Sequence, residues 1–188
     1  MLNSLAALYG NGVAASTTAY ESIATVTIGS GGSSTITFSS IPQTYSHLQI
    51  RAISRSNASG SDDYYKIRFN GDSGSNYRYD HYVGGDGSSV FAGTDGAGTF
   101  NILNYGAGST SGSNVYGVFV YDILDYTSTN KNKTGRALAG LDRNGSGSLA
   151  LFSTLWYATP AAITSMTIEV GAGTLFSQYS QFALYGVK

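Results

Sequence analysis

The feature of this sequence that most constrains its fold is a series of short segments in which apolar and polar residues alternate. The clearest are ATVTI (24–28), STITF (34–38) and HLQIRAI (47–53), and turn-forming Gly, Ser or Asn residues follow each of them. Successive side chains of a β-strand point to opposite faces of a sheet, so this alternation predicts strands with one buried face. We therefore expect β-structure from residue 20 onward.

Segments of the same kind continue to the end of the chain, about a dozen residues apart, as in all-β sandwiches. They are YKIRF (65–69), VYGVFVYDIL (115–124), TGRALAGL (134–141), SLALFSTLW (148–156), SMTIEV (165–170) and QFALYGV (181–187). This spacing predicts an all-β, jelly-roll-like antiparallel sandwich of roughly eight to ten strands. In two of the earlier strands the side chains expected to point inward are Leu48, Ile50, Ala52, Tyr65, Ile67 and Phe69.

Two local signals refine this prediction. Asn70-Gly71 predicts a hairpin turn, because both residues tolerate the positive φ angles of a type I′ turn. Helix is expected only at the start of the chain and in short pieces, such as one near Pro160.

The first 19 residues differ from the rest, because leucines recur there at helical spacing and Gly10-Asn11-Gly12 ends the run. We therefore divide the chain into an N-terminal arm (1–19) and a β-domain (20–188). The arm either lies on its own domain as a short helix or docks on a neighbouring chain. Its docking residues would be Leu2, Leu5, Leu8 and Tyr9.

Charge and composition exclude several classes of partner. Ten Lys and Arg face eleven Asp and Glu, so the chain lacks the basic footprint of a nucleic-acid binder. No stretch reaches transmembrane length, and no basic residue precedes the short Leu/Ala run, so we expect neither a membrane partner nor a secretory signal. Cysteine is absent, which excludes disulfides and thiolate metal sites.

Two predicted strands, 115–124 and 148–156, are apolar on both alternating faces. Such a strand must be covered on both faces. The opposing sheet covers one face, and a loop, the arm or another subunit would cover the other. Aromatic side chains suit a subunit contact, because they bury a large area and keep a polar tip. The interface candidates are Tyr116, Phe119, Tyr121, Phe152 and Trp156.

The residues that most often perform chemistry are few and scattered. His47 shares the outward face of its strand with Gln49 and Arg51, and no H-x-H or H-x-x-x-H pair joins it to His81. The only glutamates, Glu21 and Glu169, form no evident acid–base pair. We therefore expect no catalytic residue, no metal site and no cofactor.

The segment LDRNGSGS (141–148) resembles a calcium loop only in its first positions. Asp142, Asn144 and Ser146 have the required spacing, but Ser153 stands where an EF-hand needs a bidentate Glu, and both flanks are predicted strands. The segment therefore predicts a hairpin turn.

The aromatic stretch NYRYDHY (76–82) precedes a glycine-rich stretch (84–98) that is expected to be a loop. Alternation places Tyr77 and Tyr79 on one face, and together with Tyr82 they could form a platform on which a sugar stacks. Packing in the core or at an interface is the other interpretation, and the one we favour.

Several blocks together resemble a known family: FSSIPQTYSHLQIR, FNGDSGSNY, DILDYTSTNKNKT, LDRNGSG and FALYGVK. The family consists of short virion structural proteins encoded by tailed bacteriophages, notably cyanophages and other aquatic phages. The resemblance covers about residues 20–188 and contains no catalytic motif. It implies a β-rich protein, often trimeric, that is attached to the capsid or the tail.

We therefore expect a non-enzymatic capsid decoration (cement) protein, assembled into the virion in the host cytoplasm. Trimers would sit over junctions of the phage major capsid protein, with the arm as the clamp. The alternative is a tail-fibre or receptor-binding domain that recognises host surface glycans. The short arm and the missing shaft favour decoration, and a glycan-cleaving enzyme would need a carboxylate pair.

Overall fold

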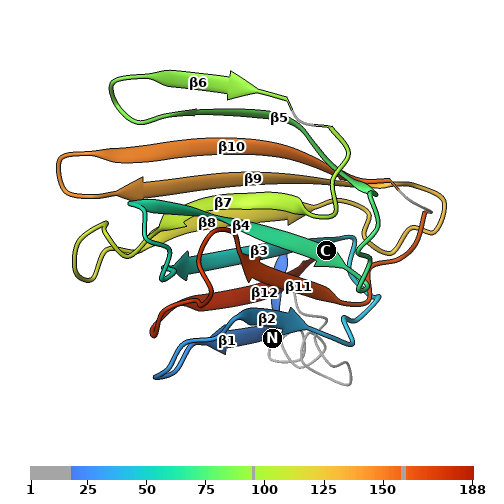
Figure 1. The fold of residues 1–188 in the computed structure, drawn as a ribbon. Helices are drawn as coiled ribbons and strands as arrows, with labels where there is room; N and C mark the ends of the chain where they lie inside the picture. Colours follow the sequence, from blue (N-terminus) through green and yellow to red (C-terminus); the bar gives the residue numbers. More distant parts are fainter. Residues whose placement is uncertain (1–17, 95, 158–159) are drawn as a thin grey trace, which may run out of the picture.

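The computed structural model describes residues 18–94, 96–157 and 160–188, except for the side chains of residues 79–81 and 104. In this part of the chain all secondary structure is β, and every named strand pair is antiparallel. Two sheets form a sandwich (Figure 1), which confirms the predicted all-β class. Residues 160–165 are irregular, so the short helix predicted near Pro160 is not found among them.

Twelve strands are formed by the described residues, against the eight to ten expected. They are β1 (Tyr20–Thr27), β2 (Thr35–Phe38), β3 (His47–Ser54), β4 (Asp62–Phe69), β5 (Tyr77–Gly85), β6 (Val90–Gly93), β7 (Asn101–Ala107), β8 (Gly117–Ile123), β9 (Lys133–Asp142), β10 (Gly147–Trp156), β11 (Met166–Val170) and β12 (Gln181–Val187). β6 lies within the glycine-rich stretch that was expected to be a loop, and β7 follows it.

The chain passes repeatedly from one sheet to the other, and strands from its two ends pair with each other. The large sheet runs β1-β12-β3-β8-β9-β10-β5-β6 and the small sheet runs β2-β11-β4-β7. The first strand therefore pairs with the last, and β2 pairs with β11. The β9–β10 and β5–β6 hairpins lengthen the large sheet, and the β5–β6 hairpin extends past β7, the edge of the small sheet (Figure 1).

The core lies between the two sheets. The six side chains predicted to point inward from β3 and β4 are all buried, with exposures of 6% or less. Aromatic rings dominate this core: the centroid of Tyr65 lies 5.0 Å from that of Phe176 and 6.3 Å from that of Phe119, both in edge-on arrangements. Edge-on ring pairs stabilise a core beyond the area that they bury.

Several glycines lie in strands directly beneath aromatic rings. On β9 the inward positions Gly135, Ala137 and Ala139 are small, and a Cβ at Gly135 would overlap the ring and hydroxyl of Tyr121. Gly106 on β7 has the same relation to Tyr65. Part of the high glycine and tyrosine content therefore comes from rings packed onto bare backbone, and not only from turns.

Asn70 and Gly71 have positive φ angles of 52° and 70°, as the turn signal predicts, but the hairpin expected there is not formed. β4 belongs to the small sheet and β5 to the large one, so the turn carries the chain between sheets. The Asn70 side-chain oxygen accepts a hydrogen bond from the Thr164 amide at 2.8 Å, and Asp72 accepts one from the Trp156 indole at 2.7 Å. These contacts tie the turn to both layers.

Candidate functional site

The outer face of the large sheet carries a continuous aliphatic surface. Direct cross-strand neighbours form two adjacent rows, one running through Val118, Gly140 and Leu149 and the other through Val120, Leu138 and Leu151. Large side chains of this surface, which we call the outer aliphatic patch, are between 39% and 84% exposed. They are Ile53, Val83, Val90, Val118, Leu138, Leu149 and Leu151.

Strand alternation and register produce this surface. On β10, Ala150 and Phe152 point into the core, so Leu149 and Leu151 must point out. Gly140 and Gly85 lie in one of these rows and carry no side chain, so the row has gaps between its aliphatic side chains. Two open depressions lie on this surface, with volumes of about 460 and 540 Å³.

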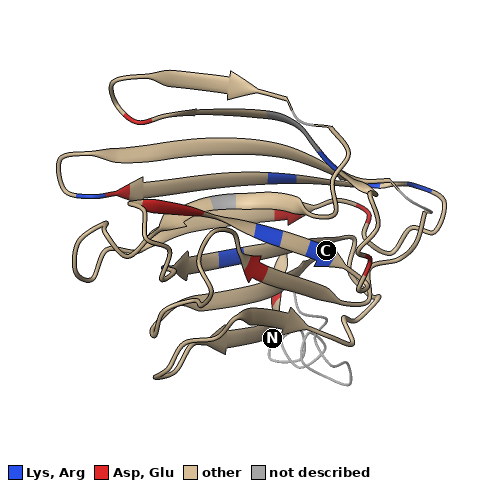
Figure 2. Cartoon of the chain, in the orientation of Figure 1, with Lys and Arg blue, Asp and Glu red and all other residues tan. Residues whose placement is uncertain are grey.

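A polar row borders the outer aliphatic patch. Arg136 Nη2 lies 3.2 Å from Asp122 Oδ2, and Gln49 Nε2 donates to Asp122 Oδ1 at 2.6 Å. Arg51 donates to Gln49, and its guanidinium lies 5.0 Å from the ring centroid of Tyr185. Figure 2 shows charge at this border, whereas β6 and β10 contain no charged residue.

The aromatic side chains predicted for a subunit interface do not lie on this surface. Phe119, Tyr121, Phe152 and Trp156 are core residues with exposures of 5% or less, so this assignment is wrong for all four. Tyr116 is half-buried, and its hydroxyl donates to the Gln178 carbonyl at 2.8 Å. The strands do have two apolar faces, but the aromatic face is the inner one.

The three tyrosines considered as a sugar platform do not form an exposed platform. Tyr77 is fully buried, and this burial raises its pKa to about 12. Tyr82 is half-buried against Phe152 and Phe91, with ring centroids 6.2 Å away in both cases. A β-bulge shifts the register of β5 between these two tyrosines, so simple alternation misplaces them. The side chain of Tyr79 lies outside the described part.

His47 has a structural partner. Its Nδ1 accepts a hydrogen bond from the Asp125 amide at 3.0 Å and lies 3.8 Å from an oxygen of the Asp125 carboxylate. Lys131 binds that carboxylate at 2.9 Å, and this bond lowers the pKa of Asp125. The side chain of His81 lies outside the described part of the structure. The arm residues Leu2, Leu5, Leu8 and Tyr9 also lie outside the described residues.

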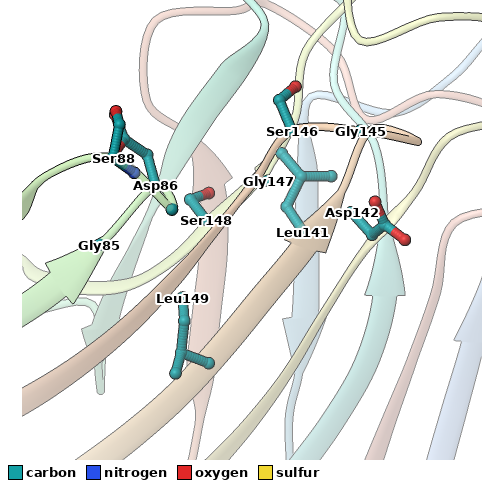
Figure 3. Close-up of a pocket in the computed structure, with 11 residues that line it drawn as sticks. Gly85, Asp86, Ser88, Leu141, Asp142, Gly145, Ser146, Gly147, Ser148 and Leu149 are labelled. Carbon is teal, nitrogen blue, oxygen red and sulfur yellow. Dashed lines mark hydrogen bonds between the residues drawn. The ribbon is translucent and has the colours of Figure 1, made fainter.

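The segment 141–148 forms the β9–β10 hairpin, as its sequence predicts. Asp142 accepts the Asn144 amide at 2.8 Å, and the Arg143 amide donates to the Ser146 carbonyl at 2.7 Å. A wide hollow of about 770 Å³ separates this hairpin from the turn after β5 (Figure 3). Among the described residues, no three His, Cys, Asp or Glu side chains gather as metal ligands would.

Comparison with known proteins adds no assignment, because no protein-family model, curated protein or solved structure matches the chain. No helix in the described ranges is long and apolar enough to cross a membrane. The outer aliphatic patch is therefore the candidate site that geometry alone brings forward.

Proposed function

We propose that this chain is a non-enzymatic virion structural protein of the capsid-decoration type, whose copies associate through the outer aliphatic patch. The patch itself carries the proposal. Seven large aliphatic side chains, each between 39% and 84% exposed, gather on one face of the large sheet, and contiguous exposed apolar patches mark sites of interaction with other proteins. A second copy placed on the patch would remove these side chains from water, and a stable interface of this kind buries about 800 Å² on each partner.

The chemistry of the patch favours a second copy of this chain as its occupant. Aliphatic rows without charge match one another as well as they match any partner, and a net charge of −1 leaves little repulsion between copies. The border contains Arg51, Asp122 and Arg136, so it offers both signs of charge to the border of a neighbour.

The strand order supports the jelly-roll form of this proposal. In a jelly roll, eight strands form two four-stranded sheets through nested Greek keys. The orders β1-β12-β3-β8 and β2-β11-β4-β7 fit that arrangement, with the β5–β6 and β9–β10 hairpins inserted and added to one sheet. The inserted hairpins supply most of the outer aliphatic patch.

The oligomer is tested by measuring the mass of the full chain in solution, by light scattering, for the wild type and for Leu149→Asp. Leu149 is 55% exposed, so an aspartate there leaves the fold of the single chain intact. At the proposed contact its charge would have to lose its water without gaining a partner, which disfavours association. We expect a trimer for the wild type, in which different parts of the patch meet around a three-fold axis, and single chains for the variant. Leu124→Asp is the matched control, because Leu124 is 49% exposed but lies beyond the polar border.

A wild-type protein that is monomeric at all concentrations, or a Leu149→Asp variant that keeps the wild-type mass, contradicts contact through the patch. A dimer would retain the contact but replace the trimer by a two-fold arrangement of faces.

The capsid partner is tested separately, by mixing expanded phage heads with the full chain and with a chain that lacks residues 1–19. We expect the full chain to bind the lattice of the major capsid protein and the shortened chain to stay in solution. Equal binding of the two chains would remove the arm as the clamp, and absence of binding by either would contradict the decoration role.

A further inference from the structure

A second, smaller cavity lies beneath the overhanging end of the large sheet. The β5–β6 hairpin extends past β7 (Figure 1), and a cavity of about 470 Å³ opens there between this hairpin, β7, the start of β4 and the β9–β10 turn. It lies on the inner side of the hairpin, so it is distinct from the outer aliphatic patch. Its walls differ in chemistry.

One wall is aromatic. The ring centroid of Phe91 lies 6.2 Å from that of Tyr82 and 6.3 Å from that of Tyr105. Two of these rings lie over glycines of the paired strand in the β5–β6 hairpin, Tyr82 over Gly93 and Phe91 over Gly84. A Cβ at either glycine would overlap the ring above it. Phe91 is inclined at 49° to Tyr82 and meets Tyr105 edge-on at 75°, so the three rings line this side of the cavity with faces in different directions, and a sugar ring can stack on one of them.

The other wall is polar, and its residues come from three separate parts of the chain. Asp62 begins β4, Asp86 follows β5, and Arg143 lies in the β9–β10 turn. The Arg143 side chain is only 17% exposed: its Nη1 donates to Ser61 Oγ at 3.1 Å and lies 4.0 Å from an oxygen of Asp62. The guanidinium is thus already oriented before any ligand arrives.

Asp86 is oriented as well. Its Oδ1 accepts the Ser89 amide at 2.9 Å and the Ser88 amide at 3.1 Å, and these bonds lower its pKa and keep the carboxylate charged. Ser148, which lines the same cavity and appears beside Asp86 in Figure 3, has a buried hydroxyl oxygen with no hydrogen-bond partner among the described residues. A buried hydroxyl without a partner is unfavourable, so a ligand that supplies one gains from it.

We infer that this cavity binds a neutral sugar, with the ring stacked on the aromatic wall and its hydroxyl groups bonded to Asp62, Asp86 and Arg143. An aromatic face packs against the C–H face of a pyranose, while carboxylates accept from sugar hydroxyls and a guanidinium donates to them. The volume lies within the about 300–1,000 Å³ of small-ligand sites.

Two other ligand classes fit less well. Two carboxylates against one guanidinium disfavour an anion such as phosphate. A quaternary ammonium needs several aromatic faces around one gap, whereas Phe91 packs directly against both Tyr82 and Tyr105. The walls therefore select an uncharged ligand that both stacks and forms hydrogen bonds.

The test is saturation-transfer NMR on the full chain with glucose, galactose, mannose and N-acetylglucosamine, and with disaccharides of each, at millimolar concentration. Inorganic phosphate and choline serve as charged probes. We expect transfer to the C–H protons of at least one sugar, and binding at least tenfold weaker in Arg143→Ala and in Phe91→Leu. Lys131→Ala is the matched control, since the Lys131 side chain is 68% exposed, is paired with Asp125 and lines neither the cavity nor the outer aliphatic patch.

Unfolding curves show whether each variant is folded, and Asp62→Asn replaces Phe91→Leu if that variant is not. No transfer to any sugar, transfer that survives the cavity variants, or a response to choline or phosphate alone would overturn the inference. The mass of the oligomer is a separate measurement, so either proposal can fail without the other.

Discussion

The two faces of the large sheet are both apolar, yet different residues build them. On the inner face, rings such as Phe119 and Tyr121 alternate with small residues such as Ala137, whereas the outer face carries medium-sized aliphatics such as Val118 and Leu138. Rings need small neighbours to interdigitate, and β9 supplies three in succession on its inner side: Gly135, Ala137 and Ala139. For a strand with two apolar faces, the sizes of side chains on the neighbouring strand identify the core better than hydrophobicity does.

The largest expected contrast is between adjacent residues of β8. Phe119→Ala should lower the free energy of unfolding by about 3–5 kcal/mol, because it leaves a cavity among rings that cannot collapse. Val118→Ala should cost less than about 1 kcal/mol in the single chain, because Val118 is already 51% exposed. Urea denaturation at a concentration where the protein is monomeric measures both. Equal losses would mean that the outer face is covered within the chain.

A second contrast uses two glycines of β9. Gly135→Ala should cost about 2–3 kcal/mol, because its Cβ overlaps Tyr121, whose hydroxyl is held 2.7 Å from Thr154 Oγ1 in the core. At Gly140, on the outer face, the nearest atoms lie 3.9 Å away, so Gly140→Ala should change stability little. Thermal and urea unfolding of both variants provide the comparison.

Gly135→Ala should cost less in a Tyr121→Leu background than in the wild type, because that substitution removes both the hydroxyl and the ring carbons that the new methyl group meets. If both glycine variants cost the same, the loss would reflect lost strand flexibility or propensity, and ring packing would not be its cause.

The polar end of the inner face gives a smaller effect that depends on pH. Burial alone would raise the pKa of Asp72, but hydrogen bonds from the Trp156 indole, the Gly74 amide and Asn76 lower it overall. Asp72→Asn should lower the free energy of unfolding by about 1–2 kcal/mol at pH 7. The pKa of Asp72 is lower in the folded chain than in the unfolded chain. Its contribution to the free energy of unfolding is therefore fully present at pH values above the unfolded pKa, and it is lost as the pH falls through the folded pKa.

The difference between wild type and Asp72→Asn should therefore be full at neutral pH and shrink below about pH 4. Urea denaturation between pH 2.5 and 7 measures it. A difference that is constant across this range would assign the effect to packing of the amide instead of to the charge of Asp72.

Much of the fold could be predicted because alternation survives in single-faced strands. Leu48, Ile50 and Ile67 are buried as their register requires. β6 was missed because VFAG is short and glycine-rich on both sides, so only its pairing with β5 identifies it. The Asn70-Gly71 turn has the expected backbone, but a local signal says nothing about which sheet the next strand joins.

The candidate site was less predictable, for two physical reasons. Aromatic residues suit interfaces and cores equally, and the small residues Gly135, Ala137 and Ala139 were the signal that favoured the core for their neighbours. The β5 bulge then moved Tyr82 onto the same side as Tyr77, which no alternation rule can foresee. The cavity beneath the β5–β6 hairpin is lined by residues from three separate parts of the chain. They lie close together because of the order of the strands in the two sheets, which the sequence pattern does not reveal.

The smallest expected effect concerns the polar border of the outer face. The Arg136 side chain is 74% exposed, and its 3.2 Å contact with Asp122 is a surface ion pair, so Arg136→Gln should change the single-chain free energy of unfolding by less than about 0.5 kcal/mol. Raising the salt concentration should remove even this difference. Urea denaturation at low and high salt, at a concentration where the protein is monomeric, measures both. A loss above about 1 kcal/mol would mean that the bond to Asp122 holds β8 to β9. It would count against the proposal that the outer face serves contacts between copies instead of stabilising the fold.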